Sequence, residues 1–227
     1  KRLNQPEDKI ITLEDPIEYK LQGINQSQIE HGKNYGFADG LRSILRQDPD
    51  IVMVGEIRDT ETADIAVQAA LTGHLVVSTI HTNSAAGAIP RFLSMGVKPF
   101  LLAPALNAVI GQRLLRRLCV DCKVPTKLSA PQLKQTQQLL KAIPAASGET
   151  VPPEAEWKFM GPGDNKTCPT CGGMGYKGRV GIYEILTITN DVEEAILRPD
   201  SDASESETQG LAMKHGMITM AQDGLLK

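Results

Sequence analysis

Short apolar runs alternate with stretches of helical apolar spacing in the first half of the chain. The runs at 9–13, 51–54 and 75–80 have the length of buried strands. Between them, apolar residues recur at helical spacing over 37–45 and 60–73. Because strands that alternate with helices are joined by right-handed crossovers, the pattern predicts an α/β fold with a mostly parallel sheet.

Each of the three predicted strands runs into a polar side chain. Glu14 follows the first strand, Glu56 the second and His81 the third. Parallel strands end at one edge of a sheet, and this edge is where open α/β sheets hold their ligands. Carboxylates on a rigid element suit Mg²⁺ or its bound water, because hard cations prefer oxygen ligands. The same pattern also occurs with solvated acids at strand ends, and at this point both interpretations stay open.

The stretch after the third strand has helical spacing. We expect a helix over 84–95 that contains Pro90, and a longer helix over 99–118 that contains Pro104. A proline inside a helix costs about 3 kcal/mol, so a kink is expected at each position. Three arginines lie near the end of the longer helix: Arg113, Arg116 and Arg117. They would complement the negative end of the helix dipole, with a contact to another subunit as the alternative.

The four cysteines form two Cys-x-x-Cys pairs, Cys119 with Cys122 and Cys168 with Cys171. Two such pairs present four thiolates to Zn²⁺ in tetrahedral geometry, which predicts a structural zinc site with no open position. The 45 residues between the pairs exceed the usual spacing, but a longer loop costs only about 0.6 kcal/mol per doubling of its length. Ordinary buried thiols and a redox dithiol are the alternatives, and no thioredoxin-like strand and helix surround the pairs.

The rest of the chain is predicted as shorter elements. A capping box precedes a helix over 132–143, and glycines punctuate a predicted strand over 175–186. Asn190 is expected to cap a short helix that ends at Leu197. The acid-rich segment 200–207 is predicted as a solvated loop, and 208–227 as a last helical stretch.

Composition narrows the class of protein. A formal net charge of -3 and an aromatic content of 4% exclude the basic, aromatic-rich pattern of nucleic-acid binders. The apolar content of 41% is sufficient for a hydrophobic core. No apolar stretch approaches the roughly 18–20 residues that cross a bilayer, and no signal peptide is evident. We therefore expect a soluble chain.

Five segments, at 11–19, 45–59, 71–83, 112–119 and 175–184, resemble those of one known family, the secretion and pilus-assembly ATPases of the GspE and PilB type. The segments 11–19, 45–59 and 71–83 resemble its Asp box, Walker B region and His box. The segments 112–119 and 175–184 resemble its later, zinc-bearing part. Together they extend over most of the chain.

The resemblance implies a RecA-like P-loop ATPase core that uses ATP and Mg²⁺. Glu14 would activate the attacking water, and Glu56 would hold Mg²⁺ through water. His81 would sense the γ-phosphate, His74 would support it, and Arg58 would contact an acid or the nucleotide. For His74 an alternative stays open, because a histidine after a helix-stopping glycine often only caps backbone groups.

Three regions are expected: a partial RecA-like core over 1–118, a zinc-binding region with a helical insertion over 119–173, and C-terminal strand and helices over 174–227. The chain contains no Gly-x-x-x-x-Gly-Lys-[Ser/Thr] loop, whose backbone N–H groups and lysine cradle phosphates. In the family that loop lies upstream of the Asp box. We therefore expect a C-terminal fragment that neither binds ATP tightly nor hydrolyses it alone.

The resemblance also implies partners and a location. The parent protein would be a cytoplasmic homohexamer, peripheral to the inner membrane, that hydrolyses ATP to power type IV pilus assembly or type II secretion. Its partners would be platform and assembly proteins, and the isolated fragment would be a monomer or weak oligomer. Pilus assembly, secretion and DNA uptake are not distinguished. A zinc-ribbon scaffold without ATPase activity is the alternative, and no direct nucleic-acid partner is expected.

Overall fold

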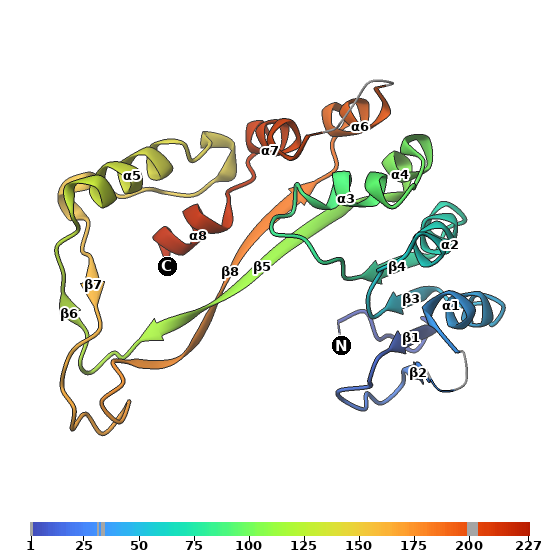
Figure 1. Cartoon of the computed structure of the whole chain (residues 1–227), viewed down its shortest axis with the longest axis horizontal. Coiled ribbons are helices and arrows are strands. Elements are labelled where there is room, and N and C mark those ends of the chain that lie inside the picture. The colour runs from blue at the N-terminus through green and yellow to red at the C-terminus, as the bar shows by residue number, and fades with distance from the viewer. Residues whose placement is uncertain (1, 31, 33–34, 199–203) are drawn as a thin grey trace. The chain divides into compact units, whose positions relative to one another are not determined.

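A computed structural model represents the chain, and the ribbon is drawn in Figure 1. The residues that it describes are 2–30, 32, 35–198 and 204–227. They form two compact units, which are described separately below. The first unit comprises residues 1–109 and 188–208, and the second comprises residues 110–187 and 209–227.

The first unit is built on a four-stranded sheet. Its strands are β1 (Ile10–Glu14), β2 (Asn25–Gln28), β3 (Ile51–Val54) and β4 (Leu75–Ser78). Their order is β2-β1-β3-β4, and every neighbouring pair is parallel. This confirms the α/β class and the parallel sheet that the alternating pattern predicted.

The central strands β1 and β3 are almost continuous apolar runs because they are buried. Val52 and Val54 of β3 are fully buried, as is Leu13 of β1, because a strand inside a parallel sheet is covered on both faces. The helix α1 (Phe37–Leu45) comes close to β1. A side-chain carbon at Gly40 would lie 2.7 Å from Leu13, so glycine permits this close approach.

The helix α2 (Thr60–Leu71) begins and ends where its signals predicted. Asp59 is the N-cap, and its carboxylate accepts a hydrogen bond of 2.8 Å from the Thr62 backbone N–H. Gly73 follows the helix with a φ of 103°, the left-handed conformation in which glycine carries no steric penalty. The boundaries of α2 therefore follow from local signals.

The helix predicted over 84–95 is shorter, because α3 runs over Ala88–Ser94. Pro90 thus lies in its first turn, where a missing N–H costs no helical hydrogen bond, and the expected kink there was wrong. The helix α4 (Pro99–Ala105) is followed in this unit by α6 (Asn190–Leu197), whose N-cap is Thr189 rather than Asn190.

The long helix predicted over 99–118 was wrong. The chain leaves the helix after Ala105, and β5 (Ala108–Leu118) pairs with β8 (Tyr176–Thr187) in a two-stranded sheet whose strands run in opposite directions (Figure 1). Leucine, glutamine and arginine favour helices locally. The hydrogen bonds to β8 override that preference. Since β8 lies far along the sequence from β5, the local pattern of β5 does not reveal this pairing.

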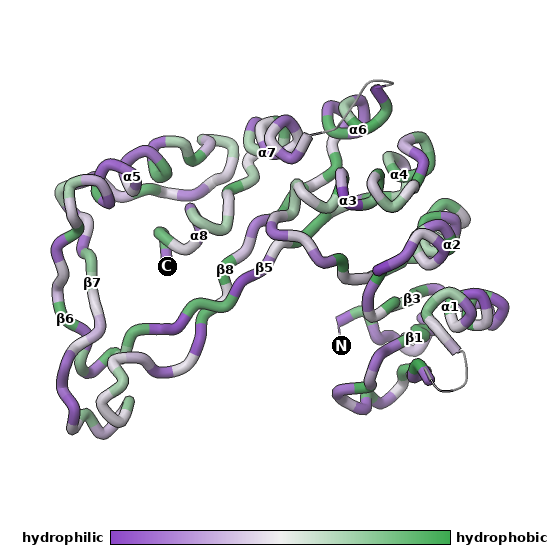
Figure 2. The backbone as a smooth tube through the Cα atoms, viewed as in Figure 1, coloured by the Kyte–Doolittle hydropathy of each residue, from purple (hydrophilic) through white to green (hydrophobic). Residues whose placement is uncertain are grey.

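The three arginines therefore do not lie at a helix end. The guanidinium of Arg116 lies 4.1 Å from the centre of the Tyr176 ring, in cation–π geometry. Figure 2 shows that hydrophobic and hydrophilic segments alternate along β5 and β8. Because all three arginines lie in β5, which pairs with β8, they do not complement the end of a helix dipole.

The second unit also contains two very short strands, β6 (Val124–Pro125) and β7 (Met160–Gly161), and the helix α5 (Ala130–Lys141). Between α5 and β7 the chain forms the single turns η2 (Ala145–Ser147) and η3 (Glu154–Glu156). As predicted, α5 begins with a capping box, in which the Ser129 backbone N–H donates a hydrogen bond of 2.9 Å to Gln132.

The structure of the C-terminal region differs from the prediction of a loop over 200–207 and one helical stretch over 208–227. Residues 200–203 lie outside the described residues, but α7 begins within the predicted loop and spans Glu205–Lys214. Gly216, with a φ of 96°, separates it from α8 (Met220–Leu226). A left-handed glycine ends a helix, so the stretch 208–227 forms two helical pieces rather than one.

Neither compact unit is continuous in the sequence. Pairing of β5 with β8 joins residues on both sides of the cysteine pairs, whereas α6 belongs to the unit that contains the parallel sheet. No helix among the residues that the structure describes is long and apolar enough to cross a membrane.

Candidate functional site

The carboxyl edge of the parallel sheet carries the residues that end β1, β3 and β4. Glu14 and Gly55 are neighbours there, because the Gly55 backbone N–H donates a hydrogen bond of 2.7 Å to the Leu13 carbonyl. A side-chain carbon at Gly55 would lie 3.1 Å from that carbonyl oxygen. Glycine therefore lets the chain turn tightly just before Glu56.

A second pair of hydrogen bonds joins the ends of β3 and β4. The hydroxyl of Thr79 donates to the Gly55 carbonyl at 2.8 Å, and the Ile57 N–H donates to the Thr79 carbonyl at 2.9 Å. Glu56 lies between the two residues that are held in this way. Its backbone is thus positioned by the neighbouring strand end.

The Glu56 carboxylate is the centre of a small cluster. Its Oε2 atom accepts a hydrogen bond from Arg58 Nε and lies 3.1 Å from His81 Nε2. The Glu56 side chain is only 14% exposed, whereas Arg58 is 67% and His81 77% exposed. A mostly buried carboxylate beside an exposed guanidinium and an exposed imidazole is suited to binding a charged ligand that approaches from solvent.

Two residues that sequence reasoning missed hold Glu14. The Thr12 hydroxyl donates to Glu14 Oε1 at 2.6 Å, and Gln26 Nε2 donates to the same oxygen at 2.8 Å. Thr12 lies two residues before Glu14 and so on the same face of the strand, which is a signal that the sequence contained. Gln26 belongs to β2, and no local pattern connects it with Glu14.

The structure does not bring His74 to this edge. His74 precedes β4, so it lies at the opposite end of that strand from His81. Its Nδ1 atom lies 3.0 Å from the Ala69 carbonyl oxygen and 3.3 Å from the Thr72 hydroxyl. This geometry is that of a histidine beside the backbone groups at the C-terminus of α2.

The edge is exposed rather than enclosed. A surface hollow lies at the starts of α1 and α2, lined by Tyr35, Gly36, Phe37, Ala38, Asp39, Asp59 and Glu61. Asp59 already caps α2, and none of the three edge residues Glu14, Glu56 and His81 lines this hollow.

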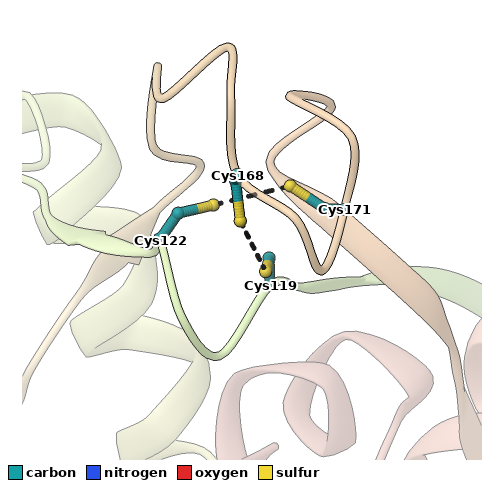
Figure 3. A group of neighbouring side chains, drawn as sticks. All are labelled: Cys119, Cys122, Cys168 and Cys171. Carbon is teal, nitrogen blue, oxygen red and sulfur yellow. Dashed lines mark hydrogen bonds between the residues drawn. The ribbon is translucent and has the colours of Figure 1, made fainter.

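The four cysteines, far apart in the sequence, meet in the second unit as predicted (Figure 3). The Sγ atoms of Cys119 and Cys168 are 3.9 Å apart, and those of Cys122 and Cys171 are 3.6 Å apart. All four sulfurs lie within 4.8 Å of one another, and all four residues are buried. Zinc–sulfur bonds of about 2.3 Å in a tetrahedron place sulfurs about 3.8 Å apart. The donor set therefore fits a closed zinc site.

The thiols differ in how readily they ionise. Burial raises the pKa of Cys122 to about 12. For Cys171 burial acts in the same direction, but hydrogen bonds outweigh it, including one of 3.3 Å from the Gly175 backbone N–H, and lower the pKa to about 7. A bound metal ion would offset the cost of ionising a buried thiol such as Cys122.

Glycines allow the cysteine loops to approach one another. A side-chain carbon at Gly163 would lie only 1.7 Å from the Cys122 carbonyl oxygen, a distance that no real contact permits. Gly173 and Gly175 have φ values of 82° and 72°, in the left-handed region. The loop geometry around the cysteines thus depends on residues without side chains.

Comparison with known proteins identifies relatives over the whole chain. The family described as Type II/IV secretion system protein matches residues 1–227. Type II secretion system protein E of Pectobacterium carotovorum subsp. carotovorum is 46% identical over 230 residues, covering 100% of this chain and 41% of the relative. The type IV pilus assembly ATPase PilB of Thermus thermophilus is 44% identical over 227 residues, covering 100% of this chain and 24% of the relative. The chain thus spans less than half the length of these curated relatives.

A solved structure has the same fold. The crystal structure of the pilus retraction motor PilT with bound ADP superposes with a TM-score of 0.59 and 28% sequence identity. The match covers 97% of this chain and 49% of PilT. The similarity includes both the α/β sheet and the part of the chain that follows it.

Proposed function

The chain belongs to the family of type II/IV secretion system proteins, and we propose that it is part of an ATPase motor that hydrolyses ATP to drive type II secretion or type IV pilus assembly. The observation that carries the proposal is the cluster at the carboxyl edge of the parallel sheet. There Glu14 and Glu56 end neighbouring strands, and His81 lies 3.1 Å from Glu56. Relatives at 44–46% identity are named for secretion and for pilus assembly, which supports the two alternatives equally.

In this proposal the two carboxylates have different roles. Glu14 orients and deprotonates the attacking water, because its Oε1 atom is held by two donors and no hydrogen bond from a described residue reaches its Oε2 atom. Glu56, whose Oε2 atom contacts Arg58 and His81, would hold Mg²⁺ through water. Bound Mg²⁺ supplies neutralisation of the phosphate oxygens. His81, being exposed, contacts the terminal phosphate.

The proposal assigns the phosphate cradle to another part of the full-length protein. The sequence has no glycine-rich loop with the lysine that binds phosphates, and the edge is open. The isolated chain is therefore inactive in this proposal, and the full-length protein acts as a homohexamer in the cytoplasm at the inner membrane. Its partners there are platform and assembly proteins of the secretion or pilus machine.

The cysteine cluster has a structural role in the proposal. Cys119, Cys122, Cys168 and Cys171 would hold Zn²⁺ with four protein ligands and no open position. Bound zinc supplies no chemistry to ATP there. It stabilises the loops that connect β5 and β8 to the inserted segment.

The test is steady-state ATP hydrolysis by the full-length protein and its Glu14→Gln variant. The variant keeps a hydrogen-bonding group of the same size but cannot accept a proton. We expect it to bind ATP normally and to lose turnover about a hundredfold or more. A full-length protein without turnover, or a variant with normal turnover, would contradict the proposal and favour a scaffold.

A further inference from the structure

The Glu14 carboxylate is folded back over the sheet by two neighbours. Thr12 and Gln26 are register partners across β1 and β2, so their side chains lie beside each other on one face. Glu14 is two residues beyond Thr12 and projects to the same face. Both neighbours donate to Glu14 Oε1, at 2.6 Å and 2.8 Å. The other oxygen, Oε2, receives no hydrogen bond from any residue within the described ranges.

The amide of Gln26 has only one orientation that satisfies its surroundings. Its Oε1 atom accepts a hydrogen bond of 2.8 Å from the Leu21 backbone N–H. Its Nε2 atom donates to Glu14 and, at 3.0 Å, to the Tyr19 carbonyl. If the amide were rotated by half a turn, its oxygen would face two acceptors and its NH₂ group would face a donor. The donor to Glu14 is therefore set by the network.

We propose that Gln26, together with Thr12, is a positioning residue that determines which oxygen of Glu14 meets the attacking water. This inference rests on the proposed function of Glu14. The terminal torsion of a glutamate is broad, so an unheld carboxylate exchanges its two oxygens freely. Two donors on Oε1 remove this freedom and leave Oε2 as the basic atom. Placement of a catalytic group before the reaction lowers the barrier, because no ordering is needed in the transition state.

The same amide joins Glu14 to the segment that follows it. Residues 17–21 pass from the end of β1 towards β2, and Gln26 contacts this segment at both Tyr19 and Leu21. Tyr19 itself is 80% exposed. Gln26 therefore links this exposed segment to the base by hydrogen bonds.

The chain provides a matched control in Gln28. This residue lies on the same strand, and its Oε1 atom accepts a hydrogen bond of 3.2 Å from the Ile17 N–H, so it also contacts the segment after β1. Its side chain has no bond to Glu14 among the described residues. A Gln28→Met variant loses one contact to the segment, whereas Gln26→Met loses two such contacts and also the donor to Glu14.

The experiment measures kcat and KM for ATP in the full-length protein. We expect Gln26→Met to lower kcat about tenfold or more, the effect of losing one hydrogen bond to a charged group. The KM should stay within about twofold, because the residue does not touch ATP in this proposal. Gln28→Met should change neither value. Thr12→Val should lower kcat as well, while Thr12→Ser, which keeps the hydroxyl, should restore it.

The Glu14→Gln background separates this inference from the proposed function. If Gln26 acts through Glu14, Gln26→Met causes no further loss in that background. A loss of the same size in both backgrounds would overturn the inference and assign Gln26 a structural role. Normal kcat in both Gln26→Met and Thr12→Val, beside an inactive Glu14→Gln, would also overturn it and leave the proposed function intact. Normal turnover in Glu14→Gln alone would overturn the proposed function, and this inference with it.

Discussion

His81 Nε2 lies 3.1 Å from Glu56 Oε2, although 25 residues separate the two in the sequence. The contact exists because β3 and β4 are parallel neighbours with a register that pairs Val54 with Ser78. Two strands that end at one edge place their following residues side by side. The helix α2 occupies the intervening sequence and returns the chain to the start of the sheet.

The charge of Glu56 is the first target for substitution. In the full-length protein we expect Glu56→Gln to lower ATP turnover about a hundredfold, because the neutral amide no longer attracts the cation shell, Arg58 or His81. Steady-state hydrolysis over a range of Mg²⁺ concentrations measures the effect. The control is Glu61→Gln, since Glu61 pairs with Arg42 at 2.6 Å on the surface and should leave turnover unchanged. Equal losses in both variants would argue against a role of the edge.

The isolated 227-residue chain should not bind ATP tightly. The edge is open, and the sequence contains no loop of backbone N–H groups for the phosphates. Calorimetric titration with ATP and Mg²⁺ tests this, with the full-length protein as the positive control. A dissociation constant for the isolated chain in the nanomolar to low micromolar range would mean that these residues suffice for binding.

Removal of zinc should loosen one part of the chain only. The four cysteines join loops on either side of a long insertion, and the second unit has few other buried residues near them. We expect a chelator to increase hydrogen exchange over residues 119–185 and to leave the first hundred residues unchanged. Metal analysis should find one zinc per chain, and less in Cys168→Ser. Exchange that rises evenly over the chain, or not at all, would contradict a local structural site.

Gly163 should be the most sensitive glycine of the cysteine loops. A methyl group there would overlap the Cys122 carbonyl, so Gly163→Ala must displace the loop. We expect a loss of about 3 kcal/mol in the free energy of unfolding and weaker zinc retention. The control is Gly210→Ala in α7, where the added carbon meets nothing within 4 Å and should stabilise the helix by up to about 1 kcal/mol. Chemical denaturation of both variants measures the difference, and similar stabilities would refute the predicted overlap.

Gln222 should link α8 to α5. Its side chain is 1% exposed, and its Nε2 atom donates a hydrogen bond of 3.0 Å to the Leu139 carbonyl. We expect Gln222→Ala to destabilise the chain by about 1–3 kcal/mol, because the Leu139 carbonyl loses this donor and a cavity forms at the buried side chain. Gln135→Ala on the exposed face of α5 is the control and should change stability little. Thermal melting compares the two, and equal melting temperatures would show that Gln222 does not join the helices.

Several features of the site were predictable from short segments. An apolar run followed by an acid predicted the strand β3 and the position of Glu56 at its end, because all of these residues lie within one short segment. The Cys-x-x-Cys pairs likewise predicted a cluster, because their spacing is typical of metal ligands. Thr12 was within reach of the same reasoning, as it shares a strand face with Glu14. Gln26 was not, since its contact depends on the register of β1 with β2.

The sequence by itself determined the α/β class, the three strand ends at one edge and the meeting of the cysteines. These depend on hydrophobic periodicity, glycine and proline stops and ligand spacing, which are properties of short segments. Tertiary structure alone decided that residues 108–118 form a strand, that His74 lies away from His81 and that Gln26 holds Glu14. The physical reason is that the strand 108–118 and the contact of Gln26 depend on hydrogen bonds to residues distant in the sequence. The position of His74 depends on where β4 begins, because His74 precedes that strand and His81 follows it.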